Sequence, residues 1–128
     1  MPREEMTIDE YRALTKARKY GNKKVTADGY EFDSLAEARR YEQLKLMEQA
    51  GAISDLRLQP RYELQRGFTD NEGKRQRAIV YVGDFAYSEK GKWIIEDTKG
   101  VETPVFKLKK KMFLYLYPHY RLRVTKVK

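Results

Sequence analysis

The sequence predicts an α/β (α+β) fold in which helices flank a mixed central sheet. Two segments, 34–49 and 103–117, have helical patterns, and each begins with a hydroxyl residue suited to cap a helix. Strand-like runs alternate with these helices, at 56–66, 79–87, 93–99 and 120–125. From the first of these helices onward the order is therefore αβββαβ, which is typical of helices layered against a sheet.

Residues 1–24 are predicted to form a basic N-terminal arm that contains a short helix. Ile8, Tyr11 and Leu14 recur at about helical spacing. The lysines and arginines between 12 and 24 fit a solvated face and a DNA-contacting arm equally well. Residues 25–128 are predicted to form one domain.

Turn and cap residues define the remaining elements. The Asp28-Gly29 pair predicts a tight hairpin, because such a turn needs positive φ. The helix at 34–49 starts at Ser34 as N-cap and ends before Gly51. Pro60 indicates an edge strand or a bulge in 56–66. Thr103-Pro104 is a favourable start for the second helix, and a polar turn is expected at 67–74.

The hairpin of 79–87 and 93–99 carries the candidate chemistry. A loop of four residues, 89–92, pairs Ser88 with Trp93 and places Asp84 opposite Asp97, whereas a loop of five residues places it opposite Glu96. Lys99 shares a strand face with Asp97 but not with Glu96, which favours the first register. Two adjacent carboxylates repel each other unless a cation lies between them. A lysine beside such a cation suits hydrolysis of a phosphodiester.

Asp84 and Asp97 are the candidate ligands of a divalent cation, together with the backbone carbonyl of Thr98. Hard oxygen donors of this kind suit Mg²⁺, which keeps several waters. Lys99 is expected to position or deprotonate the attacking water and to offset negative charge in the transition state. Glu37 is a third candidate carboxylate, on the inward face of its helix. The alternative is a capping role, because Ser34 and Glu37 match a capping box.

Composition and charge favour a nucleic-acid substrate. The 128-residue chain has a net charge of +8, although it contains 19 aspartates and glutamates. A basic surface with an acidic focus suits an enzyme that cuts DNA, and a non-catalytic basic protein is the alternative. Phosphate contacts are predicted for Lys107, Lys110, Lys111, Arg66, Arg75 and Arg77.

The same composition excludes several kinds of site. The chain has no cysteine, which excludes disulfides, zinc-thiolate sites and thiol nucleophiles. The single histidine, His119, cannot make a histidine-rich metal site. No apolar run approaches the roughly 20 residues of a membrane span, and the N-terminus has no apolar signal core. A cytoplasmic protein without a membrane partner is therefore expected.

Taken together, these residues resemble the PD-(D/E)XK nuclease superfamily. The matching pattern is a helix glutamate, Glu37, a strand aspartate, Asp84, the run Asp97-Thr98-Lys99 and a following basic helix. More specifically, residues 22–118 resemble small phage and prophage proteins that include Holliday-junction-resolvase-like endonucleases. One departure is Gly83, where the pattern has proline. The matching segments are Asp28-Gly29-Tyr30-Glu31-Phe32-Asp33-Ser34, Glu37, Tyr41, Gln59-Pro60, Tyr81, Asp84-Phe85 and Glu96-Asp97-Thr98-Lys99-Gly100.

The resemblance implies both a fold and an activity. The implied fold is a restriction-endonuclease-like αβββαβ core, preceded by an N-terminal helix and hairpin. The implied activity is Mg²⁺-dependent DNA cleavage, in which Mn²⁺ can substitute, with Glu37, Asp84 and Asp97 around the metal and Lys99 beside the water.

The resemblance also implies partners and a setting. Branched or junction DNA is the expected substrate, a homodimer is the expected assembly, and phage recombination in a bacterial host is the expected role. The alternatives are a nicking or restriction-like endonuclease, a nuclease subunit of a larger complex, and a non-catalytic DNA-binding protein on a nuclease-like fold.

Overall fold

The structure is a computed structural model that describes residues 5–7, 24–99 and 101–126. The chain divides into two compact units, residues 1–51 and 52–128. The helix predicted around Ile8, Tyr11 and Leu14 lies outside the described residues. Neither of the helices within the described ranges is long and apolar enough to cross a membrane.

The first unit contains a small sheet, whose strands are β1 (Glu5–Thr7), β2 (Lys24–Ala27) and β3 (Tyr30–Phe32). β1 runs parallel to β2, and β2 pairs antiparallel with β3. Asp28 and Gly29 form the turn between β2 and β3 with φ values of 53° and 80°. The hairpin predicted from the Asp-Gly pair is therefore confirmed.

Helix α2 (Leu35–Gln49) completes the first unit and begins where the sequence predicts. The Ser34 hydroxyl accepts a hydrogen bond from the backbone N–H of Glu37 at 3.1 Å, which is the expected N-cap contact. The helix ends before Gly51, whose φ of 81° only glycine adopts without strain. The buried face of α2 carries Glu37, Ala38, Tyr41 and Leu44, so Glu37 points inward as predicted.

The second unit is built on a four-stranded sheet with the order β11-β10-β9-β4. β10 pairs antiparallel with β9 and parallel with β11, and β4 pairs antiparallel with β9. The predicted mixed sheet of an α+β protein is confirmed. The strands are β4 (Ser54–Leu58), β9 (Phe85–Glu89), β10 (Lys92–Lys99) and β11 (Tyr120–Lys126).

Helix α3 (Pro104–Leu116) packs onto the second unit through two phenylalanines. It begins as predicted, with the Thr103 hydroxyl accepting from the backbone N–H of Phe106 at 3.1 Å. Its buried side chains join a single apolar cluster, which consists of Leu64, Tyr81, Ala86, Ile95, Phe106 and Phe113.

Two segments predicted as single strands are each broken in the structure. The segment 56–66 becomes β4 and β5 (Arg61–Gln65), and 79–87 becomes β8 (Ile79–Val82) and β9. Both breaks occur at the same level, because the Gly83 N–H donates to the Pro60 carbonyl at 3.0 Å. The chain passes very close to the sheet here: a Cβ at residue 83 would lie 2.8 Å from Ile95 Cγ2. The glycine that departs from the resembled pattern is therefore required by packing in this chain.

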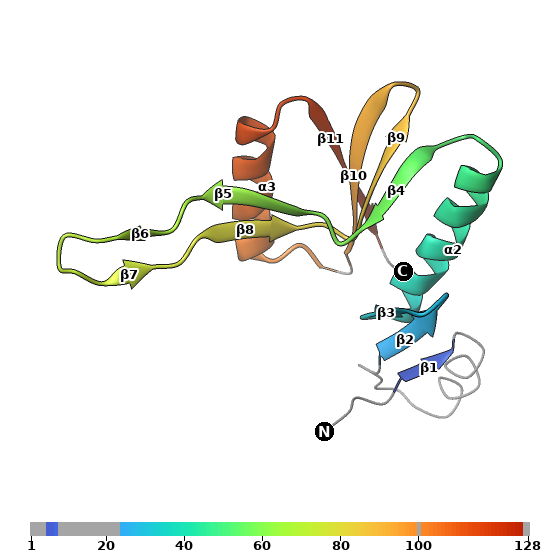
Figure 1. Ribbon diagram of the computed structural model, residues 1–128, viewed down its shortest axis with the longest axis horizontal. Helices are drawn as coiled ribbons and strands as arrows, with labels where there is room; N and C mark the ends of the chain where they lie inside the picture. The colour runs from blue at the N-terminus through green and yellow to red at the C-terminus, as the bar shows by residue number, and fades with distance from the viewer. Residues whose placement is uncertain (1–4, 8–23, 100, 127–128) are drawn as a thin grey trace. The chain divides into compact units, whose positions relative to one another are not determined.

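As a result, β5 and β8 pair with each other as a separate ribbon. The ribbon continues into β6 (Phe68–Thr69) and β7 (Arg75–Gln76), so the expected polar turn at 67–74 is in fact the end of a longer hairpin. Figure 1 shows this ribbon projecting away from the four-stranded sheet of the second unit. We call residues 61–82 the hairpin arm.

The β9–β10 hairpin has the predicted register but a shorter loop. Ser88 pairs with Trp93, as expected, and Glu89 also pairs with Lys92. The loop is therefore the two residues Lys90 and Gly91, with φ values of 50° and 78°, rather than the expected four. Positive φ at both positions is typical of the tight turns that join two twisted strands.

Candidate active site

Asp84 stands just beyond the last pair of the β9–β10 ladder, in which Phe85 faces Glu96. One further step in this register places Asp84 beside Asp97, as predicted, and excludes the register in which it faces Glu96. Asp97 is only 1% exposed to solvent. The structure thus brings together the two carboxylates that the sequence indicates as metal ligands.

Hydrogen bonds fix the orientation of both carboxylates. Asp84 Oδ2 accepts from the backbone N–H of Thr98 at 2.7 Å and from the Thr98 hydroxyl at 2.6 Å. Asp97 Oδ2 accepts from the Tyr81 hydroxyl at 2.7 Å. Outer contacts of this kind hold metal-binding carboxylates in a productive orientation.

The electrostatics of the pair favour a bound cation. Burial, with a smaller contribution from the neighbouring charge of Asp84, raises the pKa of Asp97 from 3.8 to about 6, against the opposing effects of the Tyr81 hydrogen bond and the Lys99 charge. Burial, followed by the hydrogen bond to Asp97, also raises the pKa of Tyr81 well above its usual range. Above about pH 6 Asp97 is therefore ionised beside Asp84, and a metal ion held by both side chains would favour this ionised form.

Lys99 lies beside this pair, on the same face of β10 as Asp97. Its Nζ is 3.3 Å from Asp97 Oδ1 and 4.5 Å from the centre of the Phe106 ring. Phe106 is buried in the first turn of α3, so the helix and the carboxylate together hold the ammonium group. Lys99 is half-buried, which leaves part of its side chain open to solvent.

The donor set fits Mg²⁺. Within the described ranges, no three histidine, cysteine, aspartate or glutamate side chains group closely enough to hold a metal ion. Two carboxylates, Asp84 and Asp97, are nevertheless sufficient for Mg²⁺, which is commonly held by one or two carboxylates while waters and substrate oxygens complete its octahedron. The Thr98 carbonyl would add a further hard oxygen of the predicted kind.

The two remaining glutamates of interest have separate environments. Glu96 is completely buried on the opposite face of β10 from Asp97, where its Oε1 accepts from the Tyr87 hydroxyl at 2.8 Å. Arg123 Nη1 donates to the same hydroxyl at 2.9 Å, so Glu96 belongs to a structural network. Glu37 lies buried on α2 of the first unit. Its assignment as a third metal-site carboxylate stays a prediction.

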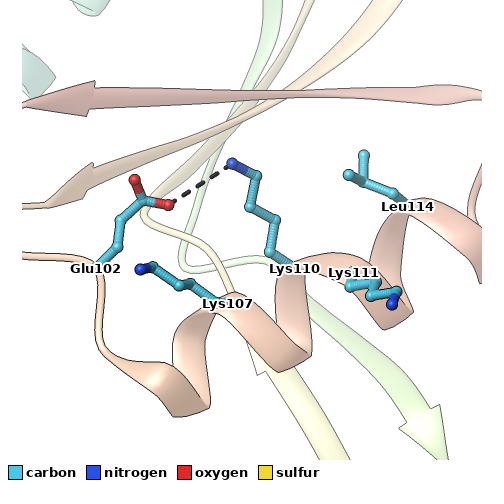
Figure 2. A pocket seen from close by; sticks show the side chains of 5 residues that line it. All are labelled: Glu102, Lys107, Lys110, Lys111 and Leu114. Carbon is cyan, nitrogen blue, oxygen red and sulfur yellow. Dashed lines mark ion pairs between the residues drawn. The ribbon is translucent and has the colours of Figure 1, made fainter.

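The predicted lysine ridge lies on one side of α3. Figure 2 shows its three lysines among the side chains that line a hollow. The volume of this hollow is about 370 Å³. Lys110 Nζ is 3.6 Å from Glu102 Oε1, so one of the three charges is partly compensated. Lys109 is not part of the hollow, because its Nζ donates to the Val80 carbonyl at 3.0 Å. The lining residues are Glu102, Lys107, Lys110, Lys111 and Leu114.

The predicted arginines Arg66, Arg75 and Arg77 are all exposed and all lie on the hairpin arm. The lysine ridge lies on a different element, α3. The second unit therefore has two separate basic surfaces.

Sequence reasoning missed two contributions to the site. Tyr81 had no assigned role, and Thr98 was assigned only through its carbonyl, whereas its hydroxyl and N–H hold Asp84. One signal existed for Tyr81. A tyrosine in a strand that must be buried needs a partner for its hydroxyl, and the nearby aspartates are the available acceptors.

Comparison with known proteins gives one match. The model of one protein family matches residues 17–128, and this family is described as "Protein of unknown function (DUF1064)". No curated protein matches the chain, and no solved structure matches it. The matched range includes Asp84, Asp97, Lys99 and the whole hairpin arm.

Proposed function

The chain belongs to the DUF1064 family, and we propose that it is a Mg²⁺-dependent DNA endonuclease of the PD-(D/E)XK type. The observation that carries the proposal is the Asp84–Asp97 carboxylate pair with the Lys99 ammonium 3.3 Å from Asp97. Carboxylates with a pKa raised in this way are common in the active sites of enzymes.

The order of elements supports the same proposal. With the strands of the hairpin arm (β5 to β8) inserted between β4 and β9, the elements α2, β4, β9, β10, α3 and β11 have the αβββαβ order of a restriction-endonuclease-like core. In the sheet order β11-β10-β9-β4, the two central strands are β10, which carries Asp97, and β9, whose start adjoins Asp84. Each of these central strands is hydrogen-bonded to a neighbouring strand on both sides, which holds the site in a fixed position.

Each residue has a distinct task in the proposed reaction. Asp84 and Asp97 hold the divalent cation, and Thr98 and Tyr81 keep these carboxylates oriented. When bound, the cation supplies a Lewis acid that stabilises negative charge on the scissile phosphate. Lys99 orients the attacking water and offsets charge that develops in the transition state.

The proposed substrate is DNA, with branched or junction DNA as the proposed preference. The two exposed basic surfaces, on α3 and on the hairpin arm, would neutralise phosphates without reading bases. A homodimer with two such sites would allow two strands to be cut symmetrically.

The proposal is tested by cleavage assays on four-way, flap, duplex and single-stranded DNA with Mg²⁺. Asp84→Asn and Asp97→Asn should each abolish cleavage while DNA binding persists, because each removes a metal-ligand charge. Two matched controls should cleave normally: Asp55→Asn, at an exposed position of β4, and Glu96→Gln, which tests the opposite face of β10. Cleavage by both site variants at wild-type rates would overturn the proposal.

A further inference from the structure

An exposed phenylalanine sits near the end of the hairpin arm. Phe68 is 44% exposed and pairs with Gln76 where β6 meets β7. It takes part in none of the aromatic ring contacts found among the described residues. Phe68 is thus a large apolar side chain left partly open to solvent on a thin, two-stranded ribbon.

The end of the arm carries four basic residues and two acidic ones, so it has an excess of positive charge. Along the part of the arm that the structure describes, none of the four basic residues near Phe68 forms an ion pair. Gly67 leaves room for one of them, since a Cβ at this position would lie 2.9 Å from Arg75 Nη2. The basic residues are Arg66, Lys74, Arg75 and Arg77.

The end of the arm is held in shape by a single aspartate. Asp70 accepts hydrogen bonds from the backbone N–H groups of Glu72 and Lys74 and from the Gln76 amide, each at 2.9 Å. Gly73 completes the turn with a φ of 82°. The Asp70 carboxylate is thus occupied by contacts within the turn, and these contacts fix the end of the ribbon that carries Phe68.

We propose that the hairpin arm enters the minor groove of duplex DNA and wedges Phe68 between two bases. Apolar wedges on basic elements unstack a base step in this way, and they act most easily where stacking is already weak. The inference rests on the proposed endonuclease function and specifies its substrate as DNA with a weakened step, such as a branch point or a nick. The arginines around Phe68 would contact the phosphates on either side.

The arm also sets the position of the wedge relative to the cleavage site. Gln76, which pairs with Phe68, precedes Asp84 by eight residues, of which Ile79–Val82 form β8. At about 3.3 Å per residue, Phe68 lies up to roughly 26 Å from Asp84, which corresponds to about eight base pairs. The weakened step is therefore expected within about eight base pairs of the cut.

The test uses a nicked duplex and a four-way junction that carry a fluorescent adenine analogue at the weakened step, in EDTA so that no strand is cut. Binding of the wild-type protein should increase the fluorescence, because the analogue brightens when it is unstacked. Phe68→Ala should remove this increase and weaken binding about tenfold. Phe68→Leu should retain part of both effects, since leucine also serves as a wedge.

A matched control and a competitor sharpen the test. Tyr115→Ala removes another exposed aromatic residue, 84% exposed on α3, and should leave the fluorescence increase unchanged. A minor-groove ligand should compete with the arm, whereas a major-groove ligand should not. Competition by the major-groove ligand alone, or an equal fluorescence increase with Phe68→Ala, would overturn the wedge.

The outcomes for the wedge and for the nuclease are distinguishable. Cleavage by the wild-type protein in Mg²⁺ without any fluorescence increase in EDTA would overturn the wedge and leave the endonuclease proposal intact. A fluorescence increase that depends on Phe68, without cleavage of any substrate in Mg²⁺, would overturn the endonuclease proposal and leave the arm as a DNA-binding element.

Discussion

Asp97→Asn should stabilise the metal-free protein at neutral pH, even though it removes a proposed metal ligand. A carboxyl whose pKa is raised by folding binds its proton more tightly in the folded state than in the unfolded state. The resulting penalty is absent below about pH 3.8, grows as the pH rises, and is fully present above about pH 6. Asparagine carries no charge at any of these pH values and still offers an acceptor to the Tyr81 hydroxyl.

The magnitude follows from the pKa of Asp97. The rise from 3.8 to about 6 corresponds to at most about 3 kcal/mol, and solvent screening at the edge of the site reduces this to roughly 2 kcal/mol. The loss of the partner for Lys99 subtracts a few tenths of a kcal/mol at most, because that lysine is half-buried. A net gain of about 1–2 kcal/mol is therefore expected for Asp97→Asn above pH 6 in EDTA.

Urea denaturation followed by circular dichroism measures this difference. The free energies of unfolding of the wild type and Asp97→Asn should converge below about pH 4 and separate as the pH rises through 6. Asp55→Asn, at an exposed position of β4, should show no such pH-dependent difference. Added Mg²⁺ should stabilise the wild type above pH 6 but not Asp97→Asn, since a ligand stabilises only the state that binds it. A variant that is less stable than the wild type in EDTA above pH 6 would refute the electrostatic reasoning.

Three further predictions concern the same site and its surroundings. Tyr81→Phe should lower Mg²⁺ affinity by about tenfold while the protein stays folded, because it removes the hydrogen bond that orients Asp97. Titration calorimetry measures this affinity, and an unaltered value would contradict the prediction. Glu37→Gln should reduce the cleavage rate far more than it reduces stability. Ser34→Ala should cost about 1 kcal/mol of stability with little effect on the cleavage rate, because Ser34 caps α2. Melting and cleavage measurements on both variants test this, and the opposite pattern would assign Glu37 to capping alone. Joint neutralisation of Lys107, Lys110 and Lys111 should reduce the slope of log binding constant against log salt concentration by up to about three units, if all three lysines touch phosphates. Lys99→Ala should keep the wild-type slope and lose cleavage. An unchanged slope in the triple variant would show that the lysine ridge is only a solvated face.

Elements defined by local chemistry could be predicted from the sequence. The Asp28-Gly29 turn, the Ser34 and Thr103 caps and the end of α2 at Gly51 each depend on the conformational preference of one or two residues. The register that joins Asp84 to Asp97 was predictable even with the wrong loop length. Loops of four and of two residues give the same pairing, because one residue is added to each strand.

Features that depend on distant contacts could not be predicted. The runs 56–66 and 79–87 have continuous strand patterns, but the chain must bend at Pro60 and Gly83 because of how the backbone approaches Ile95. The contact between Tyr81 and Asp97 likewise depends on the packing of Phe106 and Phe113 around the tyrosine ring, which no local pattern encodes.

The hairpin arm can also be regarded as a molecular ruler. Its base is fixed: β4 and β9 are antiparallel neighbours, Leu64 and Tyr81 anchor the proximal ribbon in the core, and the Gly83 N–H closes the base on Pro60. Beyond this anchor, the exposed part can change in length at little cost, because the entropic cost of closing a loop grows only slowly with the length of the loop. Each residue added to both strands would lengthen the arm by about 3.3 Å, close to the rise of one base pair. The length of one exposed ribbon would then set, base pair by base pair, the spacing between a distorted step and the bond that is cut.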